Sequence, residues 1–224
     1  MLQVCEQLCK ITCGAMAPGY PAVPFAGLAV RSNLAGTLPF SRQMFYECSM
    51  AELRVLYTRD QIARRVAELG AQIEKDFAGQ SVIFVGVLKG ATIFLADLAR
   101  AVKLDATFDF IGVASYGAQK SSSGAVRLTK DVEHPLTGRN VILVEDILDT
   151  GLTLQYLKKL FLAHQPACLK LVTLLDKSCR RVEPVKADYV GFTIPDEFVI
   201  GYGMDYAERY RNLADICVLP PEEL

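Results

Sequence analysis

The sequence predicts an α/β fold with a mostly parallel central sheet flanked by helices. Two short runs, 81–88 and 141–144, are almost continuously apolar, as expected of strands that are buried on both faces. Segments with helical spacing alternate with such strands, which favours a parallel sheet covered on both sides. The 224 residues are enough for one domain with an appendage, because a domain holds roughly 100–200 residues.

The predicted elements follow one another from Thr58 onward. Thr58 can cap a first helix, and Gln61 stands at the position that completes a capping box. The predicted helices are 59–77, 91–102 and 153–164, and the predicted strands are 81–88, 106–115, 127–132, 141–144, 168–175 and 189–194. A loop rich in Gly and Ser is expected over 116–125.

Residues 1–49 differ in composition from the rest of the chain. They hold three of the five Met and four of the seven Cys, with few charges and no sustained periodicity. We expect an N-terminal extension over 1–49, poorly ordered or an artefact of the assigned start, and a compact domain over 50–224 beginning at Met50. A targeting or regulatory arm is the alternative.

Charge and cysteine content exclude several classes of protein. The 24 Lys and Arg balance 25 Asp and Glu, so no basic footprint for nucleic acid is expected. No apolar run reaches the roughly 18 residues of a membrane span, and no secretion signal is recognisable. The odd number of scattered cysteines suggests free thiols in the cytoplasm. Cys5, Cys9 and Cys13 recur every fourth residue, which we attribute to chance rather than to a metal site.

Residues 145–153 carry the main functional signal. Glu145 and Asp146 directly follow the predicted strand 141–144, at the end of a parallel sheet where ligands bind. The turn from Asp149 to Thr153 then leads into a helix, and its amides and hydroxyls suit an anion. An acidic pair beside an anion site predicts a ligand with vicinal hydroxyls and a phosphate. The aspartic-protease turn is the rival interpretation, but it needs two copies and only one is present. A plain strand–turn–helix with surface acids is the other alternative.

This segment, VEDILDTGLT, resembles the phosphoribosyl-pyrophosphate signature of type I phosphoribosyltransferases, in the form found in hypoxanthine(-guanine) phosphoribosyltransferases. The resemblance implies their fold, with a small hood beside the sheet. It implies that Glu145 and Asp146 bind the ribose hydroxyls and Mg²⁺, and that Asp149 is the general base near N7 of the purine. It further implies that the 5′-phosphate is cradled by Thr150, Gly151, Leu152 and Thr153. Some members have Lys where this chain has Leu152.

Other segments extend the resemblance over the predicted domain. Lys89 and Gly90 match a tripeptide whose cis peptide backbone binds pyrophosphate, and Ser115 and Tyr116 match the start of a lid. Lys177 matches the lysine that donates to O6 of the purine; a lysine cannot accept from an amino group, so adenine is disfavoured. The matching purine segment is 194–206. In it Phe198 is expected to stack on the base, Val199 to contact it through main-chain groups, and Asp205 to hold a second Mg²⁺. Arg211, just beyond it, is expected to bind pyrophosphate, and Arg181 is a weaker candidate there.

The expected function is purine salvage, in which phosphoribosyl pyrophosphate and hypoxanthine or guanine give IMP or GMP and pyrophosphate. A phosphoribosyl-pyrophosphate-binding transcription regulator is an alternative, as is a transferase for xanthine or a pyrimidine. Neither nucleic acid nor a membrane is an expected partner, and the resemblance implies a homodimer or homotetramer. The sequence does not rank hypoxanthine, guanine and xanthine.

Overall fold

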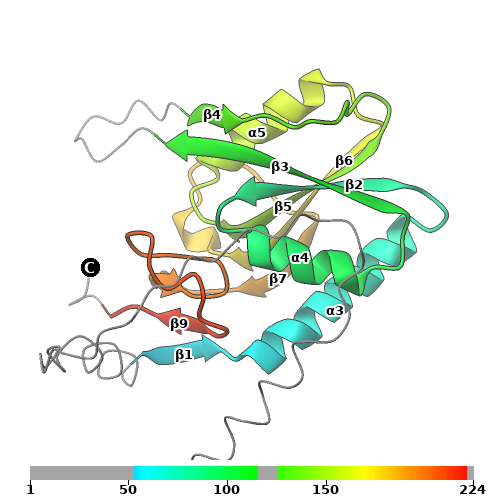
Figure 1. Cartoon of the computed structure of the whole chain (residues 1–224). Helices are drawn as coiled ribbons and strands as arrows, with labels where there is room; N and C mark the ends of the chain where they lie inside the picture. The colour runs from blue at the N-terminus through cyan, green and yellow to red at the C-terminus, as the bar shows by residue number, and fades with distance from the viewer. Residues whose placement is uncertain (1–52, 116–125, 221–224) are drawn as a thin grey trace, which may run out of the picture. The chain divides into compact units, whose positions relative to one another are not determined.

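Six strands form the central sheet, in the order β4-β3-β2-β5-β6-β7 (Figure 1). The computed structural model describes residues 53–115 and 126–220, which all fall in one unit of the chain. The strands are β2 (Val82–Leu88), β3 (Ala106–Ser115), β4 (Val126–Lys130), β5 (Asn140–Leu148), β6 (Cys168–Asp176) and β7 (Tyr189–Thr193). Only β4 runs antiparallel to its neighbour, so the sheet is mostly parallel, as predicted.

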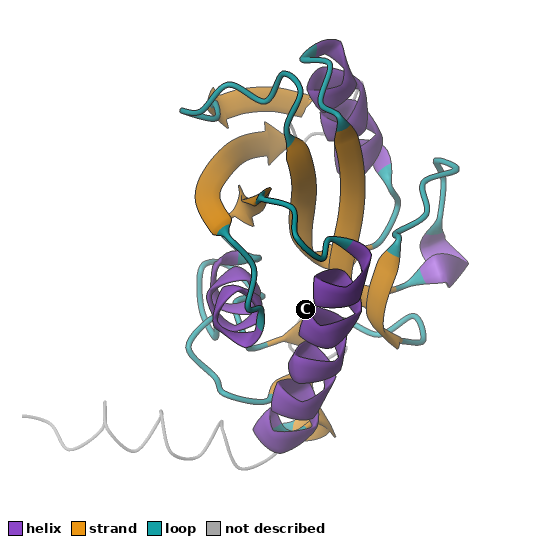
Figure 2. Cartoon of the chain, turned by 90° about the vertical axis from the view of Figure 1, so that its right-hand side faces the viewer, coloured by secondary structure: helices purple, strands orange, loops and turns teal. Residues whose placement is uncertain are grey.

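Helices cover both faces of this sheet (Figure 2). On one face α3 (Arg59–Asp76) and α4 (Thr92–Ala101) pack over strand residues such as Phe84, whereas α5 (Leu152–Ala163) packs over residues such as Ile83 on the other. Successive side chains of a strand point to opposite faces, so the unbroken apolar run of β2 supplies both cores. Each fully buried Leu, Ile or Phe stabilises the fold by about 1.5–3 kcal/mol.

The first helix begins as its sequence predicts. The Thr58 hydroxyl accepts from the amide of Gln61, and the Gln61 side chain accepts from the amide of Thr58 at 2.8 Å. This reciprocal capping box satisfies two amides that the helix itself leaves without partners.

A second, three-stranded antiparallel sheet has the order β1-β9-β8 and consists of β1 (Arg54–Tyr57), β8 (Val199–Ile200) and β9 (Ile216–Val218). Figure 1 shows β1 and β9 side by side, apart from the central sheet. This small sheet corresponds to the hood that the resemblance implied. Its strands, and the short 3-10 helix η1 (Ser178–Arg180), were not predicted individually because two to four residues carry no measurable periodicity.

The other predicted elements agree with the structure to within two residues, with one exception. The strand predicted over 141–144 continues to Leu148, so Glu145 and Asp146 lie within β5 rather than after it. Its pairing with β2 stops at Val144, whereas its pairing with β6 continues to Leu148. Glu145 and Asp146 therefore lie just beyond the last residue of β5 that pairs with β2, while they are still in the strand that pairs with β6.

Some expectations concern residues outside the described ranges: the extension over 1–49 with Cys5, Cys9 and Cys13, and the loop 116–125 with Tyr116. Within the described ranges Cys168, Cys179 and Cys217 are free thiols, in agreement with the prediction. Among the described helices, none has the combination of length and apolarity that a bilayer span requires.

Candidate active site

The candidate site lies at the carboxyl ends of β2 and β5. These strands are neighbours in the sheet, but the chain leaves them toward opposite edges of the sheet. After β2 the chain continues to β3, and after β5 it continues to β6, so the strand order diverges at this point. Such a switch point leaves a crevice at the carboxyl ends of the strands. Two predicted segments meet there. A Cβ added to Gly90 would stand 1.8 Å from Oδ2 of Asp146, so only glycine allows this approach. The preceding peptide bond, Leu88–Lys89, is cis, as the resemblance implied.

Glu145 and Asp146 form a carboxylate pair at the end of the β2–β5 pairing. Oε2 of Glu145 is buried and accepts no hydrogen bond from the described part of the chain. Burial, and then the charge of Asp146, raise the pKa of Glu145 well above its ordinary value. Burial also raises the pKa of Asp146 to about 6, although the amide of Ile147 and the charge of Arg211 oppose this shift. Two carboxylates under such conditions favour a cation or hydroxyl donors.

The turn from Asp149 to Thr153, called the phosphate loop after the role that the resemblance implies, surrounds a small hollow of about 80 Å³ directly after β5. Gly151, with φ of +85°, precedes α5 as its N-cap and makes the turn that points the chain into the helix. The first amides of a helix have no partner inside it, and the helix dipole favours an anion at this end. The hollow is lined by Glu145, Ile147, Leu148, Asp149, Thr150, Gly151, Thr153 and Leu154. Leu152 begins α5 with a 40% exposed side chain, so this position contributes an amide but no cation.

Asp149 and Lys177 lie at the ends of the adjacent strands β5 and β6. The amide of Lys177 donates to the carbonyl of Leu148 at 3.0 Å, which fixes the two chain segments next to each other. Lys177 is only 4% exposed, and its Nζ is 3.8 Å from Oδ1 of Asp196. Oδ1 of Asp149 is buried and accepts no hydrogen bond from the described residues; Nε of Arg180 is 3.8 Å away, an ion-pair distance beyond hydrogen-bond range.

Arg180 and Asp196 were not identified from the sequence. The Arg180 guanidinium lies 3.8 Å from both Asp149 and Asp196, so it connects the predicted base to the loop that follows β7. Asp196 lies in the predicted purine segment 194–206, but no role was assigned to it, and no motif contained Arg180. Their proximity depends on the short helix η1, which the sequence did not reveal.

Phe198 presents an exposed ring at the edge of the site. It is 38% exposed and meets Tyr206 edge-on with 5.7 Å between ring centroids. An exposed ring of this kind can stack on a flat ligand. Val199 is buried in β8, where it pairs with Val218 of β9, and the carbonyl of Phe198 accepts from Leu219 at 2.9 Å.

A charged network joins the loop after β2 to the segment 205–211. Arg211 contacts Oδ1 of Asp205 at 2.7 Å, and the amide of Glu208 donates to Oδ2 of Asp205 at 2.8 Å. Nζ of Lys89 is 3.0 Å from Glu208, which the sequence did not single out. The guanidinium of Arg211, which was predicted to bind pyrophosphate, and the ammonium of Lys89, whose backbone was predicted to do so, thus both contact Glu208.

The remaining two predicted residues are Ser115 and Arg181. Ser115 ends β3 opposite Val126, at the same edge of the sheet as the site. Arg181 instead has a structural role: its guanidinium contacts Asp176 and donates to the carbonyls of Leu148 and Val185, beneath the phosphate loop. These contacts give Arg181 a structural role, although its Nε has no hydrogen-bond partner among the described residues; the suggestion that it binds pyrophosphate stays a prediction.

The donor set fits a hard divalent cation that shares its ligands with a substrate. In the described ranges no three His, Cys, Asp or Glu side chains are grouped to hold a metal by themselves. The orphaned oxygen of Glu145 and the neighbouring Asp146 nevertheless provide the one or two carboxylates with which proteins usually bind Mg²⁺, the remaining ligands being water and phosphate oxygens.

Comparison with known proteins decides the family. A phosphoribosyl transferase domain model matches residues 55–207. The hypoxanthine-guanine phosphoribosyltransferase of Bacillus subtilis (strain 168) is 46% identical over 168 residues, which are 75% of this chain and 93% of that protein. The chain belongs to the hypoxanthine-guanine phosphoribosyltransferase family. The family's enzyme from Mycobacterium bovis is 46% identical over 173 residues, covering 75% of this chain and 86% of its own.

Solved structures agree with this assignment to the family. A hypoxanthine-guanine phosphoribosyltransferase from Bacillus anthracis, with HEPES in its active site, superposes with a TM-score of 0.72 at 50% identity and covers 75% of this chain and all of its own. A hypoxanthine phosphoribosyltransferase from Staphylococcus aureus gives a TM-score of 0.75 at 42% identity, with 79% and 96% covered. The fold is therefore that of the type I phosphoribosyltransferases.

Proposed function

We propose that the protein salvages purines by transferring the 5-phosphoribosyl group of phosphoribosyl pyrophosphate to hypoxanthine or guanine, which gives IMP or GMP and pyrophosphate. The observation that carries this proposal is the position of Asp149 and Lys177 at the ends of adjacent strands, beside the acidic pair and the phosphate hollow. The side of the crevice with the acidic pair and the phosphate hollow suits a sugar phosphate. The side with Lys177 suits an oxopurine. The names of the relatives from B. subtilis and M. bovis support the same activity.

Lys177 supplies the purine selectivity in this proposal. Its ammonium group is buried and has only one carboxylate, 3.8 Å away, as a described ionic partner. A buried ammonium needs an acceptor, and the O6 carbonyl of an oxopurine provides one. The 6-amino group of adenine would instead point a donor at a donor. Phe198, exposed at the same edge, would stack on the base, with main-chain groups of Val199 beside it.

Asp149 is the proposed general base. In the reaction a purine nitrogen forms a bond to C1′ of the ribose, the bond from C1′ to the pyrophosphate oxygen breaks, and the purine loses a proton. Oδ1 of Asp149 is buried and free of hydrogen bonds from the described residues, so it can accept that proton within the crevice. Ser115 and Tyr116 are proposed to begin the lid that excludes water from the reacting carbon.

Glu145 and Asp146 would hold Mg²⁺ together with the ribose hydroxyls, and Thr150, Gly151, Leu152 and Thr153 would hold the 5′-phosphate. When bound, Mg²⁺ neutralises the charge that develops on the departing diphosphate. Lys89, Gly90 and Arg211 would contact this diphosphate. Asp205 is the proposed ligand of a second Mg²⁺, and for that role its carboxylate has to exchange its contact with Arg211 for the metal.

The remaining proposals concern the setting of the enzyme. We propose a cytoplasmic homodimer or homotetramer whose ligands are phosphoribosyl pyrophosphate and an oxopurine, and not nucleic acid. The formal net charge of −1 supports the exclusion of nucleic acid, because a nucleic-acid-binding protein would concentrate basic residues.

A panel of bases tests the proposal. The full chain is incubated with phosphoribosyl pyrophosphate, Mg²⁺ and hypoxanthine, guanine, xanthine, adenine or uracil, and pyrophosphate release is followed. We expect turnover with hypoxanthine and guanine and none with adenine or uracil. Turnover with xanthine as fast as with guanine would enlarge the substrate class, and no turnover with any oxopurine would refute the proposal.

A further inference from the structure

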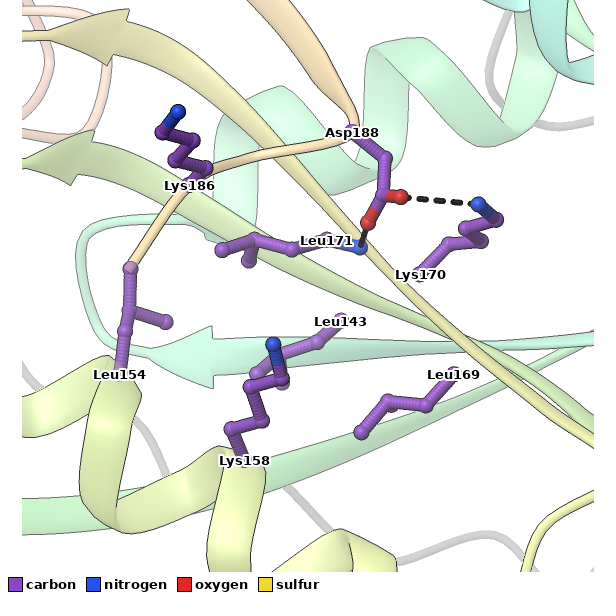
Figure 3. Close-up of a pocket in the computed structure, with 8 residues that line it drawn as sticks. All are labelled: Leu143, Leu154, Lys158, Leu169, Lys170, Leu171, Lys186 and Asp188. Atoms are coloured by element: carbon purple, nitrogen blue, oxygen red, sulfur yellow. Dashed lines mark hydrogen bonds and ion pairs between the residues drawn. The ribbon is translucent and has the colours of Figure 1, made fainter. Parts of the chain in front are cut away.

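A second cavity, of about 140 Å³, lies under α5 (Figure 3). Its walls come from β5, from α5, from β6 and from the segment that precedes β7. It shares only Leu154 with the hollow of the phosphate loop, and none of the residues proposed to bind phosphoribosyl pyrophosphate or the purine lines it. It is therefore separate from the active site.

The floor of this cavity is made of leucines. Leu143 and Leu154 are each 2% exposed and Leu171 is 8% exposed, while Leu169 completes the wall along β6. None of the described residues that line the cavity is aromatic, so they offer apolar contact without ring stacking. The volume is close to the roughly 150 Å³ of an apolar protein cavity, lined by Leu, Ile and Phe, that binds benzene. The floor therefore suits an apolar body of about one ring or a short alkyl chain.

The rim of the cavity is strongly positive. Lys158, Lys170 and Lys186 line it together with a single carboxylate, that of Asp188. Asp188 is engaged on both oxygens, since it accepts from Lys170 at 2.8 Å and from the amide of Leu171 at 2.9 Å. Within residues 53–115 and 126–220, Lys158 and Lys186 have no ion-pair partner. Two unneutralised ammonium groups thus remain at one cavity of a chain whose formal net charge is −1.

The orientation of the two lysines matters for what can bind. In Figure 3, Lys158 rises from α5 beside Leu143 toward Leu171, whereas Lys186 points outward at the rim. Lys158 therefore offers a charge next to the apolar floor, and Lys186 offers one at the entrance. An anion with an apolar body could place the body on the leucines and the charge beside Lys158.

We propose that this cavity is a binding site for a small amphipathic anion, an organic molecule with one ring or a short chain and one compact anionic group. Other ligand classes fit less well. A metal ion would find only the carboxylate of Asp188, which already has two donors, and an organic cation would be repelled by the lysines. A neutral apolar molecule would leave the two ammonium groups without a counter-charge.

Benzoate is a suitable probe, and leucine methyl groups report where it binds. The full chain is labelled with ¹³C at Leu methyls and titrated with benzoate, benzamide and benzylamine in parallel. We expect benzoate to shift the methyl signals of Leu143, Leu154, Leu169 and Leu171 with a dissociation constant of about 1 mM. Benzamide, which has the same shape without the charge, should bind at least about tenfold more weakly, and benzylamine should cause no shift.

Paired lysine substitutions provide the specific control. Lys158→Gln together with Lys186→Gln should weaken benzoate binding at least about fivefold. Lys159→Gln removes a charge from the next position of the same helix, outside the cavity lining, and should leave the affinity within about twofold. An unchanged methyl spectrum of each variant verifies that it folds.

Three results would overturn the proposal. The first is the absence of shifts at these four leucines with about 20 mM benzoate, which is far above the expected dissociation constant. The second is equal affinity for benzoate and benzamide. The third is a shift confined to Leu152 at the phosphate loop, which would place the anion in the active site instead.

Discussion

At the scale of single residues, Asp149 resembles Glu145 in having a buried oxygen without a hydrogen bond from the described residues, but unlike Glu145 and Asp146 it has no carboxylate beside it in sequence. Asp149→Asn keeps the shape but cannot take a proton. We expect kcat to fall by about 100-fold or more, as general-base catalysis contributes roughly 10²–10⁴, with KM for both substrates within about threefold. Steady-state kinetics with hypoxanthine measure both constants.

Asp196→Asn is the matched control for that experiment. Asp196 lies at the same 3.8 Å from Arg180, and also 3.8 Å from Nζ of Lys177, but its side chain is 60% exposed. We expect its kcat to stay within about threefold of the wild type, since exposed ion pairs contribute little. Equal losses in the two variants would show that the charge around Arg180, and not proton transfer by Asp149, limits the rate.

Lys177 leads to a prediction about selectivity. Lys177→Gln replaces a charged donor by a neutral amide, and hydrogen bonds to charged groups contribute about 1.5–3 kcal/mol. We therefore expect kcat/KM for hypoxanthine and guanine to fall about 10- to 150-fold, while KM for phosphoribosyl pyrophosphate changes little. Lys170→Gln, which removes a lysine of the same strand far from the purine position, should change neither. A loss that appears in phosphoribosyl pyrophosphate binding instead would contradict the assigned role of Lys177.

At the scale of elements, the connection from β2 to α4 is fixed by contact with β5. Gly90→Ala would place a methyl group against the Asp146 carboxylate and so displace one segment of the crevice. We expect at least a tenfold rise in KM for phosphoribosyl pyrophosphate. Gly79→Ala is the control, because Gly79 has φ of +73° and open space around it: it should cost about 1 kcal/mol of stability through backbone strain and leave KM unchanged. If Gly90→Ala lowered the stability but left KM for phosphoribosyl pyrophosphate unchanged, Gly90 would matter for stability only.

Asp109 anchors the turn after β4 to strand β3 and makes stability depend on pH. It is 5% exposed and accepts from the amides of Phe110, Glu133 and His134 at 2.7, 2.7 and 3.1 Å. Burial alone would raise the pKa of Asp109, but these hydrogen bonds outweigh it and lower the pKa to about 2. A lowered carboxylate pKa stabilises the fold above the unfolded value of about 4, here by roughly 2 kcal/mol, and this contribution is lost as pH falls toward 2.

Denaturant unfolding of the wild type and of Asp109→Asn between pH 2 and 7 measures this contribution. The variant should be less stable at pH 7 by about 2 kcal/mol, and the difference should shrink below pH 4. A difference that is constant over the whole range would mean that the geometry of the turn, and not the charge of Asp109, provides the stability.

Long and buried helices and strands were predicted more accurately than short elements and strand ends. Long apolar strands such as β2 and helices such as α3 were predicted because their periodicity extends over many residues. The end of β5 was misjudged, since whether Glu145 pairs with a neighbour depends on β6 and not on its own sequence. Candidate site residues were found where a motif carried them, as with Asp149 and Lys177. Arg180 and Glu208 were missed because only the folded chain brings them near these motifs.

At the scale of the whole molecule, the site is assembled from segments distant in sequence, yet every proposed site residue lies between Lys89 and Arg211. The family model begins at residue 55, and the described structure contributes its first strand, β1, at Arg54. Residues 1–49 therefore supply none of the residues proposed for catalysis or binding. We propose that residues 50–224 form the phosphoribosyltransferase domain.

Deleting residues 1–49 should accordingly leave kcat and both KM values within about twofold and the melting temperature within a few degrees. Deleting residues 1–57 is the contrasting variant, since it also removes β1. That strand pairs with β9, which pairs with β8 at Val199, and Tyr57 stacks on Phe192 with 4.0 Å between ring centroids. Loss of these contacts should lower the melting temperature by about 10 °C or more, because several kcal/mol of packing and strand pairing are removed. If the shorter deletion destabilised the protein as much as the longer one, the domain would have to include part of residues 1–49.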